Sequence, residues 1–217
     1  MARILRALAA SWQQKNHKII LKTMYRKNKQ NEFYTVLAKK EGFPARSVYK
    51  LKEIDEKYKI IRRGSRVLDL GSSPGSWLLY LSEKVGDKGT VIGIDIEEIK
   101  IPKKTNVVFI KKSIFDLKET DFKYKFEAVV SDLSPKTSGI KLLDTGKSLE
   151  MAEKAFEIAR SVLVPGGNFV SKVFDSESSR GLFTRVRNCF DFAKIFKPRA
   201  VIKGSKECYI IGRGFRV

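Results

Sequence analysis

The sequence predicts an α/β fold: one mostly parallel sheet of seven strands, with helices on both faces. Short apolar runs of strand length alternate along the chain with segments whose apolar residues recur at helical spacing. Such alternation is typical of parallel strands joined by helices. Only residues 197–206 separate the last two strand-like runs, which is too short for a parallel crossover. The sheet should therefore end in an antiparallel pair.

The expected strands are rich in branched and aromatic residues. They are Arg66–Leu70, Thr90–Asp95, Asn106–Lys111, Phe126–Asp132, Asn168–Phe174, Phe192–Phe196 and Glu207–Gly212. Apolar residues at helical spacing predict four helices, Pro44–Tyr58, Gly75–Val85, Ser148–Leu163 and Arg180–Phe190. The turn formers Pro165, Gly166 and Gly167 should stop the third helix.

Composition limits the class of protein. The chain has 217 residues, enough for one domain with a sizeable core, and its net charge is +20. So large a positive charge indicates a nucleic-acid partner. No apolar run approaches the roughly 18 residues that a membrane-spanning helix needs. The two cysteines, Cys189 and Cys208, fit a reducing compartment, and the absence of a Cys/His cluster in the sequence predicts no metal site.

The first 31 residues contain eight Lys or Arg residues and no acid. We interpret residues 1–31 as a basic arm that contacts RNA, and residues 32–217 as the catalytic domain. The alternative is an amphipathic transit peptide, because the segment around Arg3 and Arg6 is free of acids. The first interpretation predicts a cytoplasmic protein, and the second a mitochondrial one. In either case we expect a monomer.

A glycine-rich loop follows the first strand. The sequence from Val67 to Trp77 reads VLDLGSSPGSW, so Gly71 and Gly75 lie between a strand and a helix. This arrangement lets the backbone approach a nucleotide closely. The spacing differs from the dinucleotide motif Gly-x-Gly-x-x-Gly, and Asp69 favours a cationic group, such as the ammonium of S-adenosylmethionine. The alternative is an ordinary glycine-rich turn.

The second strand strengthens the nucleotide interpretation. It ends in Asp95, 20 residues after Gly75. An acid at this position binds ribose hydroxyls in strand–helix–strand nucleotide sites. An acid at a strand end can also serve only to form a turn, but this spacing favours ribose binding.

Four further polar residues stand at informative places. Asp132 ends the fourth strand, Lys172 lies in an apolar strand, Glu207 opens the last strand, and Lys50 belongs to the first helix. Lys50 lies about 40° around that helix from the apolar Ile54, which allows its amine to reach over the ligand-binding end of the sheet. Buried lysines are rare unless paired. The alternative for Lys172 is a lysine that faces or reaches the solvent.

These residues lie in motifs that resemble the FtsJ/RrmJ-type RNA 2′-O-ribose methyltransferases, a likeness that extends over residues 33–215. The matching segments are ARSVYKL at 45–51, DLGSSPGSW at 69–77, SDLSP at 131–135, KVF at 172–174 and KECY at 206–209. The resemblance implies a Rossmann-like class I fold. It also implies a Lys-Asp-Lys-Glu tetrad formed by Lys50, Asp132, Lys172 and Glu207.

The resemblance further implies that S-adenosylmethionine is the cofactor and that Gly75, Trp77, Asp95 and Asp132 line its site. Gly71 joins them from the glycine-rich loop. The family often has an acid near the adenine, where this chain has Ser113, with Asp116 three residues later. Either residue, or the backbone after Ser113, is a candidate for the adenine contact.

The tetrad suits methyl transfer to a ribose hydroxyl. The hydroxyl must lose its proton as it attacks, and a lysine amine can accept a proton only in its neutral form, which burial and a second cation favour. We therefore expect Lys172 to be the general base, with Asp132 and Glu207 orienting the amines and the hydroxyl.

The family resemblance favours a uridine of large-subunit ribosomal RNA as the target. A ribose in a tRNA anticodon loop is the alternative substrate. A catalytically silent RNA-binding factor in ribosome assembly is a second alternative, although an intact tetrad argues against it. A small-molecule methyltransferase or a dehydrogenase is disfavoured by the charge of +20.

Overall fold

The structure is a computed structural model that describes residues 31–136 and 138–216. Residues 31–40 form a first helix, which the sequence analysis did not predict. The other helices are α2 (Val48–Tyr58), α3 (Ser76–Val85), α4 (Lys141–Val162) and α5 (Glu177–Cys189), and two short 3-10 turns cover Ile114–Asp116 and Glu119–Asp121. The strands are β1 (Arg66–Leu70), β2 (Thr90–Asp95), β3 (Val107–Lys111), β4 (Phe126–Ser131), β5 (Leu163–Phe174), β6 (Phe190–Phe196) and β7 (Glu207–Phe215).

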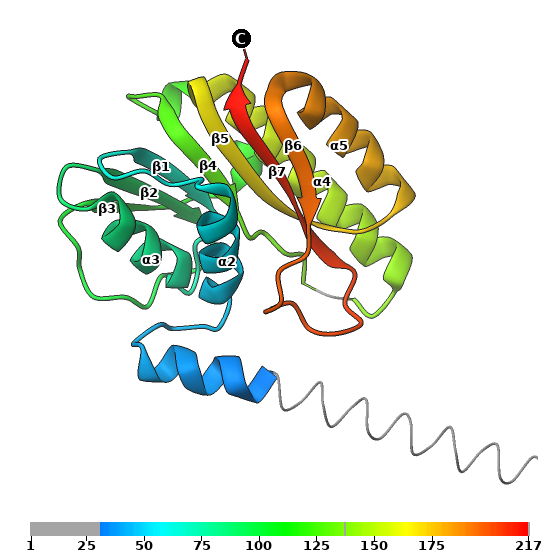
Figure 1. Ribbon diagram of the computed structural model, residues 1–217, viewed down its shortest axis with the longest axis horizontal. Helices are drawn as coiled ribbons and strands as arrows, with labels where there is room; N and C mark the ends of the chain where they lie inside the picture. Colours follow the sequence, from blue (N-terminus) through cyan, green and yellow to red (C-terminus); the bar gives the residue numbers. More distant parts are fainter. Residues whose placement is uncertain (1–30, 137, 217) are drawn as a thin grey trace, which may run out of the picture.

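The seven strands form one sheet in the order β3-β2-β1-β4-β5-β7-β6 (Figure 1). Strands β1 to β5 pair in parallel, whereas β7 is antiparallel to both β5 and β6. The predicted fold class and the antiparallel last strand are confirmed. In space, the reversed strand lies between β5 and β6, inside the sheet and not at its edge.

Alternate residues of each strand supply the two cores. Val67 packs with α2 and α3 on one face, and its neighbour Leu68 packs with α4 and α5 on the other. This is the alternation expected when successive side chains of a strand point to opposite faces. Both faces of the sheet are therefore covered, as predicted.

Several predicted boundaries were wrong. Helix α2 begins at Val48 and not at Pro44; the segment before it is held by a hydrogen bond from the Ala45 N–H to the Ser76 hydroxyl. Helix α4 begins seven residues before the predicted Ser148, because its first turns are largely exposed and show no apolar periodicity.

Helix α5 begins at Glu177 behind a capping box between Ser176 and Ser179, three residues before the predicted start. Strand β7 continues past Gly212 to Phe215, which pairs with Phe190 of a longer β6.

The topology gathers polar strand ends at one edge of the sheet. Parallel strands β1, β2, β4 and β5 all finish there, and the antiparallel β7 begins there. Glu207, the first residue of β7, is thus paired with Phe174, the last residue of β5. Among the described residues, no helix has the length and apolar character needed to cross a membrane. The predictions for the basic arm concern residues 1–30, which lie outside the described part.

Candidate active site

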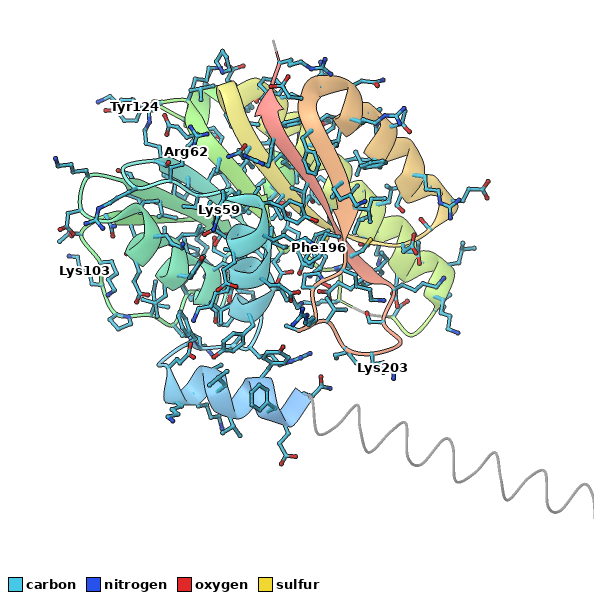
Figure 2. The ribbon with its side chains drawn as sticks, in the orientation of Figure 1. Lys59, Arg62, Lys103, Tyr124, Phe196 and Lys203 are labelled. Atoms are coloured by element: carbon cyan, nitrogen blue, oxygen red, sulfur yellow. The ribbon has the colours of Figure 1, made fainter. Side chains whose placement is uncertain are left out.

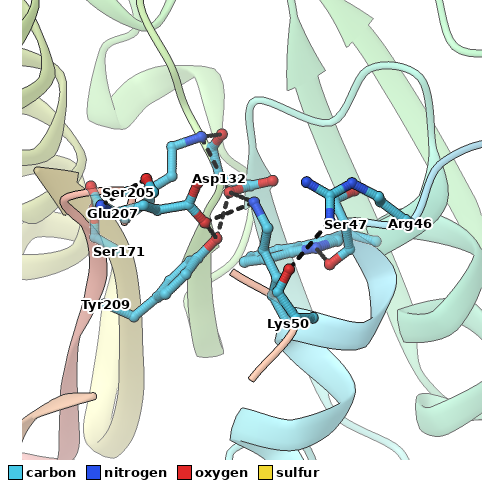
Figure 3. Close-up of polar contacts among 11 residues, drawn as sticks. Arg46, Ser47, Lys50, Asp132, Ser171, Ser205, Glu207 and Tyr209 are labelled. Atoms are coloured by element: carbon cyan, nitrogen blue, oxygen red, sulfur yellow. Dashed lines mark hydrogen bonds and ion pairs between the residues drawn. The ribbon is translucent and has the colours of Figure 1, made fainter. Parts of the chain in front are cut away.

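The structure brings the four predicted tetrad residues together at the edge where the strands end. Figure 3 labels three of them, Lys50, Asp132 and Glu207. Lys50 reaches in from α2, Asp132 follows β4, Lys172 lies near the end of β5, and Glu207 begins β7. Both lysines are buried, with 8% of Lys50 and 5% of Lys172 exposed. Residues far apart in the chain thus meet because the ends of β4 and β5, the start of β7 and the first turn of α2 lie at the same place.

The tetrad is joined by alternating charges. The Lys50 Nζ atom lies 2.6 Å from Glu207 Oε1 and 4.0 Å from Asp132 Oδ1. The Lys172 Nζ atom lies 3.1 Å from the same Asp132 oxygen and donates a hydrogen bond of 2.7 Å to the Asp132 main-chain oxygen. Two amines and two carboxylates therefore hold one another in fixed positions, and each buried charge has a partner.

Tyr209 completes this cluster, and the sequence analysis assigned it no role. Its hydroxyl oxygen lies 2.7 Å from Asp132 Oδ1 and 3.0 Å from Glu207 Oε1 (Figure 3), so its single proton can be donated to either carboxylate. Burial raises the pKa of Tyr209 well above its ordinary value, and the two carboxylates raise it further. A signal was present, because residues two apart in a strand share a face and Tyr209 follows Glu207 by two.

Asp132 stays charged in spite of its burial. Burial alone would raise its pKa, but Lys172, Lys50 and the hydrogen bond from Tyr209 act against burial, and the net result is a lowered pKa. Asp132 therefore provides a permanent negative charge between the two amines.

A cavity of about 430 Å³ opens beside Asp132, in the size range of ligand sites. Four predicted cofactor residues line it, namely Gly71, Asp95, Ser113 and Asp132. The two oxygens of Asp95 are held by the N–H groups of Ser73, at 2.8 Å, and Glu97, at 2.9 Å. Each carboxylate oxygen keeps a lone pair that can accept from a ribose hydroxyl.

Two apolar side chains that the sequence analysis missed also line the cavity. Ile96 and Phe115 are 56% and 46% exposed, which is unusual for such large apolar residues. In the sequence, the one sign that Ile96 contributes to the cavity was its position directly after the acid that ends β2. Ser113 accepts a hydrogen bond from the Phe115 N–H. Asp116, the alternative to Ser113, is exposed and does not belong to the lining.

Two predicted cofactor residues, Gly75 and Trp77, are not part of the cavity lining. Gly75 has a left-handed backbone (φ 111°), and a Cβ atom there would lie 2.5 Å from Ile101 Cγ2. The loop therefore needs glycine for its own packing. Trp77 is buried; its indole N–H donates to the Ser47 oxygen at 3.0 Å, and its ring packs against Tyr209. Trp77 thus ties the start of α2 to the floor of the tetrad.

Comparison with known proteins shows the family of this chain. Residues 43–215 match the sequence profile of the FtsJ-like methyltransferases, which is well over half of the chain. The chain belongs to this family. It is therefore an S-adenosylmethionine-dependent methyltransferase, as predicted.

Individual relatives are similar along nearly their whole length. The ribosomal RNA large subunit methyltransferase E of Desulfatibacillum aliphaticivorans is 44% identical over 189 residues, or 86% of this FtsJ-like chain and 91% of that protein. The protein of the same name from Nitratidesulfovibrio vulgaris is 40% identical, over 87% of this chain and 95% of its own. A solved ribosomal RNA methyltransferase from Plasmodium falciparum superimposes with a TM-score of 0.71 at 25% identity, over 80% of this chain and 98% of its own.

The residues around the cavity fit the cofactor of this family. Neither carboxylate oxygen of Asp69 has a hydrogen-bond partner among the described residues, since the Ser72 hydroxyl donates instead to the Asp69 main-chain oxygen. Burial raises the pKa of Asp69 well above its ordinary value, and the nearby charges of Asp132 and Asp95 raise it further. Three carboxyl groups therefore lie close together around the loop, a setting that suits the sulfonium and ammonium groups of S-adenosylmethionine. No group of metal-ligating side chains occurs in the described part of the chain.

Proposed function

We propose that this protein methylates the 2′-oxygen of a uridine ribose in large-subunit ribosomal RNA. The observation that carries the proposal is the junction of the tetrad with the cofactor cavity, because Asp132 belongs to both. The names of the two relatives, at 40–44% identity over nearly full length, support large-subunit ribosomal RNA as the substrate. The resemblance to 2′-O-methyltransferases supports a ribose hydroxyl as the acceptor and a uridine as its nucleotide.

When bound, S-adenosylmethionine would supply an electrophilic methyl group. The ribose 2′-hydroxyl is a poor nucleophile at neutral pH and needs a base. As the general base, Lys172 would accept the hydroxyl proton as the 2′-oxygen takes that methyl group. The amine ends positively charged beside Asp132, which lies 3.1 Å away and stabilises that charge.

The other tetrad members position the reacting groups. Lys50 provides the second cation of the cluster and lies 4.0 Å from the Asp132 oxygen that Lys172 also contacts. Glu207 holds Lys50 at 2.6 Å, and Asp132 holds Lys172 by two contacts. Fixed positions of this kind convert binding energy into alignment of the hydroxyl with the methyl group, which can contribute several kcal/mol.

On the cofactor side, we assign each group of S-adenosylmethionine to residues of the cavity. Asp95 would accept hydrogen bonds from the ribose hydroxyls, and Ile96 and Phe115 would cover the adenine faces. Ser113 and the backbone after it would contact the adenine edge. Asp69 is fully buried and lies outside the lining, two residues before Gly71; it would become the counter-charge of the ammonium group once cofactor binding lowers its raised pKa.

The test compares Lys172→Met with Lys194→Met, a control at an exposed lysine of β6. Each purified variant is given undermethylated large ribosomal subunits and S-adenosylmethionine, and ribose methylation is mapped along the RNA. We expect the control to methylate one uridine, and Lys172→Met to lose at least about a thousandfold in rate while it binds S-adenosylmethionine normally.

Normal methylation by Lys172→Met would refute the role of Lys172 as the general base. A wild-type protein that binds subunits but methylates no nucleotide would instead favour the silent assembly factor, and methylation of tRNA alone would favour the anticodon-loop substrate.

We also propose that residues 1–31 contribute to RNA binding, supported by their eight cations. A cytoplasmic location is supported by the two cysteines, which are both free thiols. Deletion of residues 1–30 should leave cofactor binding intact and weaken RNA binding. If the deletion changed only the location of the protein in a cell with organelles, the transit-peptide interpretation would be correct.

A further inference from the structure

A second concave surface lies on the solvent side of α2, away from the cofactor cavity. We call it the outer groove. Its volume is about 880 Å³, within the range of roughly 300–1,000 Å³ that is usual for ligand clefts. Helix 31–40 forms one wall, the outer face of α2 forms the floor, and the end of β6 with the residues that follow forms the other wall.

Aromatic rings from both walls and from the floor line this groove. Tyr34 of the first helix and Tyr49 of α2 contact each other with ring centroids 5.2 Å apart, and Phe196 stands at the end of β6. Each ring is partly exposed. Figure 2 shows Phe196 near the middle of the view, closer to the first helix than Tyr124, an exposed tyrosine at the far end of the sheet.

Cations accompany the rings. The Lys57 amine lies 4.6 Å from the centroid of Phe196, and Lys197 and Arg199 belong to the same wall. The Arg199 side chain is 89% exposed. Of the acids in the lining, Glu41 is paired with Lys52 at 2.7 Å, and Glu53 accepts the Arg199 main-chain N–H at 2.7 Å and lies 3.8 Å from the Arg199 Nε atom. These two acids hold the walls together. The third acid, Glu56, is exposed, as are the cations Lys57 and Lys197.

The outer groove and the tetrad share two elements. Helix α2 carries Tyr49 in the groove and Lys50 in the tetrad, on neighbouring positions. The connection after Phe196 runs from the groove wall to Glu207, and Arg46 holds it to the start of α2 by a 3.2 Å hydrogen bond to the Ala200 oxygen. The outer groove is therefore a neighbouring surface for a polymer whose reacting unit lies at the tetrad.

We propose that the outer groove binds an unpaired nucleotide of the RNA substrate that lies next to the methylated one. Its base stacks on the partly exposed aromatic rings, and its phosphates lie near Lys57, Lys197 and Arg199. Aromatic platforms beside a positively charged track are the usual means of holding single-stranded nucleic acid. The RNA would then contact the protein at two adjacent places, the tetrad and the outer groove. This proposal rests on the proposed function, with RNA as the substrate.

The first experiment distinguishes binding of the RNA bases from binding of the phosphates. The probes are a fluorescent oligouridine of about twelve nucleotides, within the site size of roughly 4–16 nucleotides of single-strand binders, and an abasic oligomer with the same backbone. We expect wild-type protein to bind oligouridine at least about fivefold more tightly than the abasic strand. Tyr34→Ala should lose most of this preference, and Tyr34→Phe should retain it because a phenyl ring still stacks.

Lys57→Gln is a second variant, which keeps the test valid if Tyr34→Ala loses structure locally. Lys57 lies on the solvent side of α2, and its replacement should weaken binding of both oligomers about equally, because it removes a phosphate contact. Tyr124→Ala and Lys123→Gln are the matched controls at the far end of the sheet and should bind both oligomers like the wild type.

Methylation of large ribosomal subunits completes the test. In Tyr34→Ala and Lys57→Gln the KM for the subunit should rise severalfold, with kcat and cofactor affinity unchanged. Equal affinity of the wild type for both oligomers, or groove variants indistinguishable from the controls, would overturn the proposal while methylation itself continued. Groove variants that bind RNA normally but fail to bind an assembly protein would assign the groove to a protein partner and overturn it as well. A wild type without methylation would contradict the proposed function instead.

Discussion

Tyr209→Phe removes one hydroxyl from the centre of the tetrad and leaves the ring in place. The hydroxyl contacts both carboxylates of the cluster, at 2.7 Å from Asp132 and 3.0 Å from Glu207. We infer that it keeps the two acids at a fixed separation and thereby positions Lys172 and Lys50. The variant tests whether this positioning matters for catalysis or only for folding.

The size of the effect follows from the kind of bond. A hydrogen bond to a charged group contributes about 1.5–3 kcal/mol. Loss of this amount should lower the melting temperature by about 3–12 °C in a chain of this size. If the bond contributes equally to alignment in the transition state, the rate falls by about ten- to a hundredfold. Because both lysines still hold the carboxylates, we expect a value near tenfold.

The dependence on pH has a definite sign. The folded-state pKa of Asp132 lies below its ordinary value of 3.8, and the Tyr209 hydrogen bond is one of the groups that lower it. The stability from this lowering is fully present above the unfolded pKa and is lost as the pH falls through the folded pKa. The difference in unfolding free energy between wild type and Tyr209→Phe should therefore be constant near neutral pH and shrink in acid.

Tyr80→Phe is the matched control. The Tyr80 hydroxyl is also buried and donates 2.7 Å to a buried carboxylate, that of Asp55, in a part of the core outside the tetrad. Both variants should lose similar stability in thermal unfolding. Only Tyr209→Phe should lose single-turnover methyl-transfer rate, with cofactor affinity unchanged by calorimetry. Equal rates for the two variants would refute a positioning role.

Three further changes test the cofactor site and the charge. Gly75→Val should reduce S-adenosylmethionine affinity at least tenfold by calorimetry, because its Cβ would lie 2.5 Å from Ile101. The control Gly42→Val, at a glycine that also has a positive φ (77°) but nothing within 4 Å of a Cβ, should not; equal affinities would show that the loop tolerates a side chain. Because the pKa of Asp69 is raised, the folded state keeps a proton on this group at pH values where the unfolded state has lost it. The unfolding free energy of the cofactor-free protein should therefore fall by about 1.4 kcal/mol per pH unit as the pH rises from 3.8 to that raised pKa. Urea unfolding should find this slope reduced in Asp69→Asn. RNA affinity should fall steeply with salt while cofactor affinity changes little, and an RNA complex insensitive to salt would assign the charge of +20 another role.

Local pattern was sufficient for the fold class. Strand-length apolar runs and their spacing predicted the mostly parallel sheet, because burial on both faces requires continuous apolar strands. The short connection before Glu207 predicted the antiparallel last strand, because a parallel crossover cannot be made in ten residues. The four tetrad residues stood out by their places on strands and a helix, and the family resemblance joined them into a tetrad.

Only the tertiary structure decided how these residues act together. Three features depend on contacts between segments far apart in the chain: the pairing of Lys50 with Glu207, the place of Tyr209 between two acids, and the groove wall formed by Phe196. Helix 31–40 and the first turns of α4 were missed because their exposed faces carry little apolar periodicity. The sequence by itself determined which side chains are present and which elements carry them. The distances among them were decided by the order of the strands in the sheet, because a site at strand ends exists only when those ends are brought to one edge.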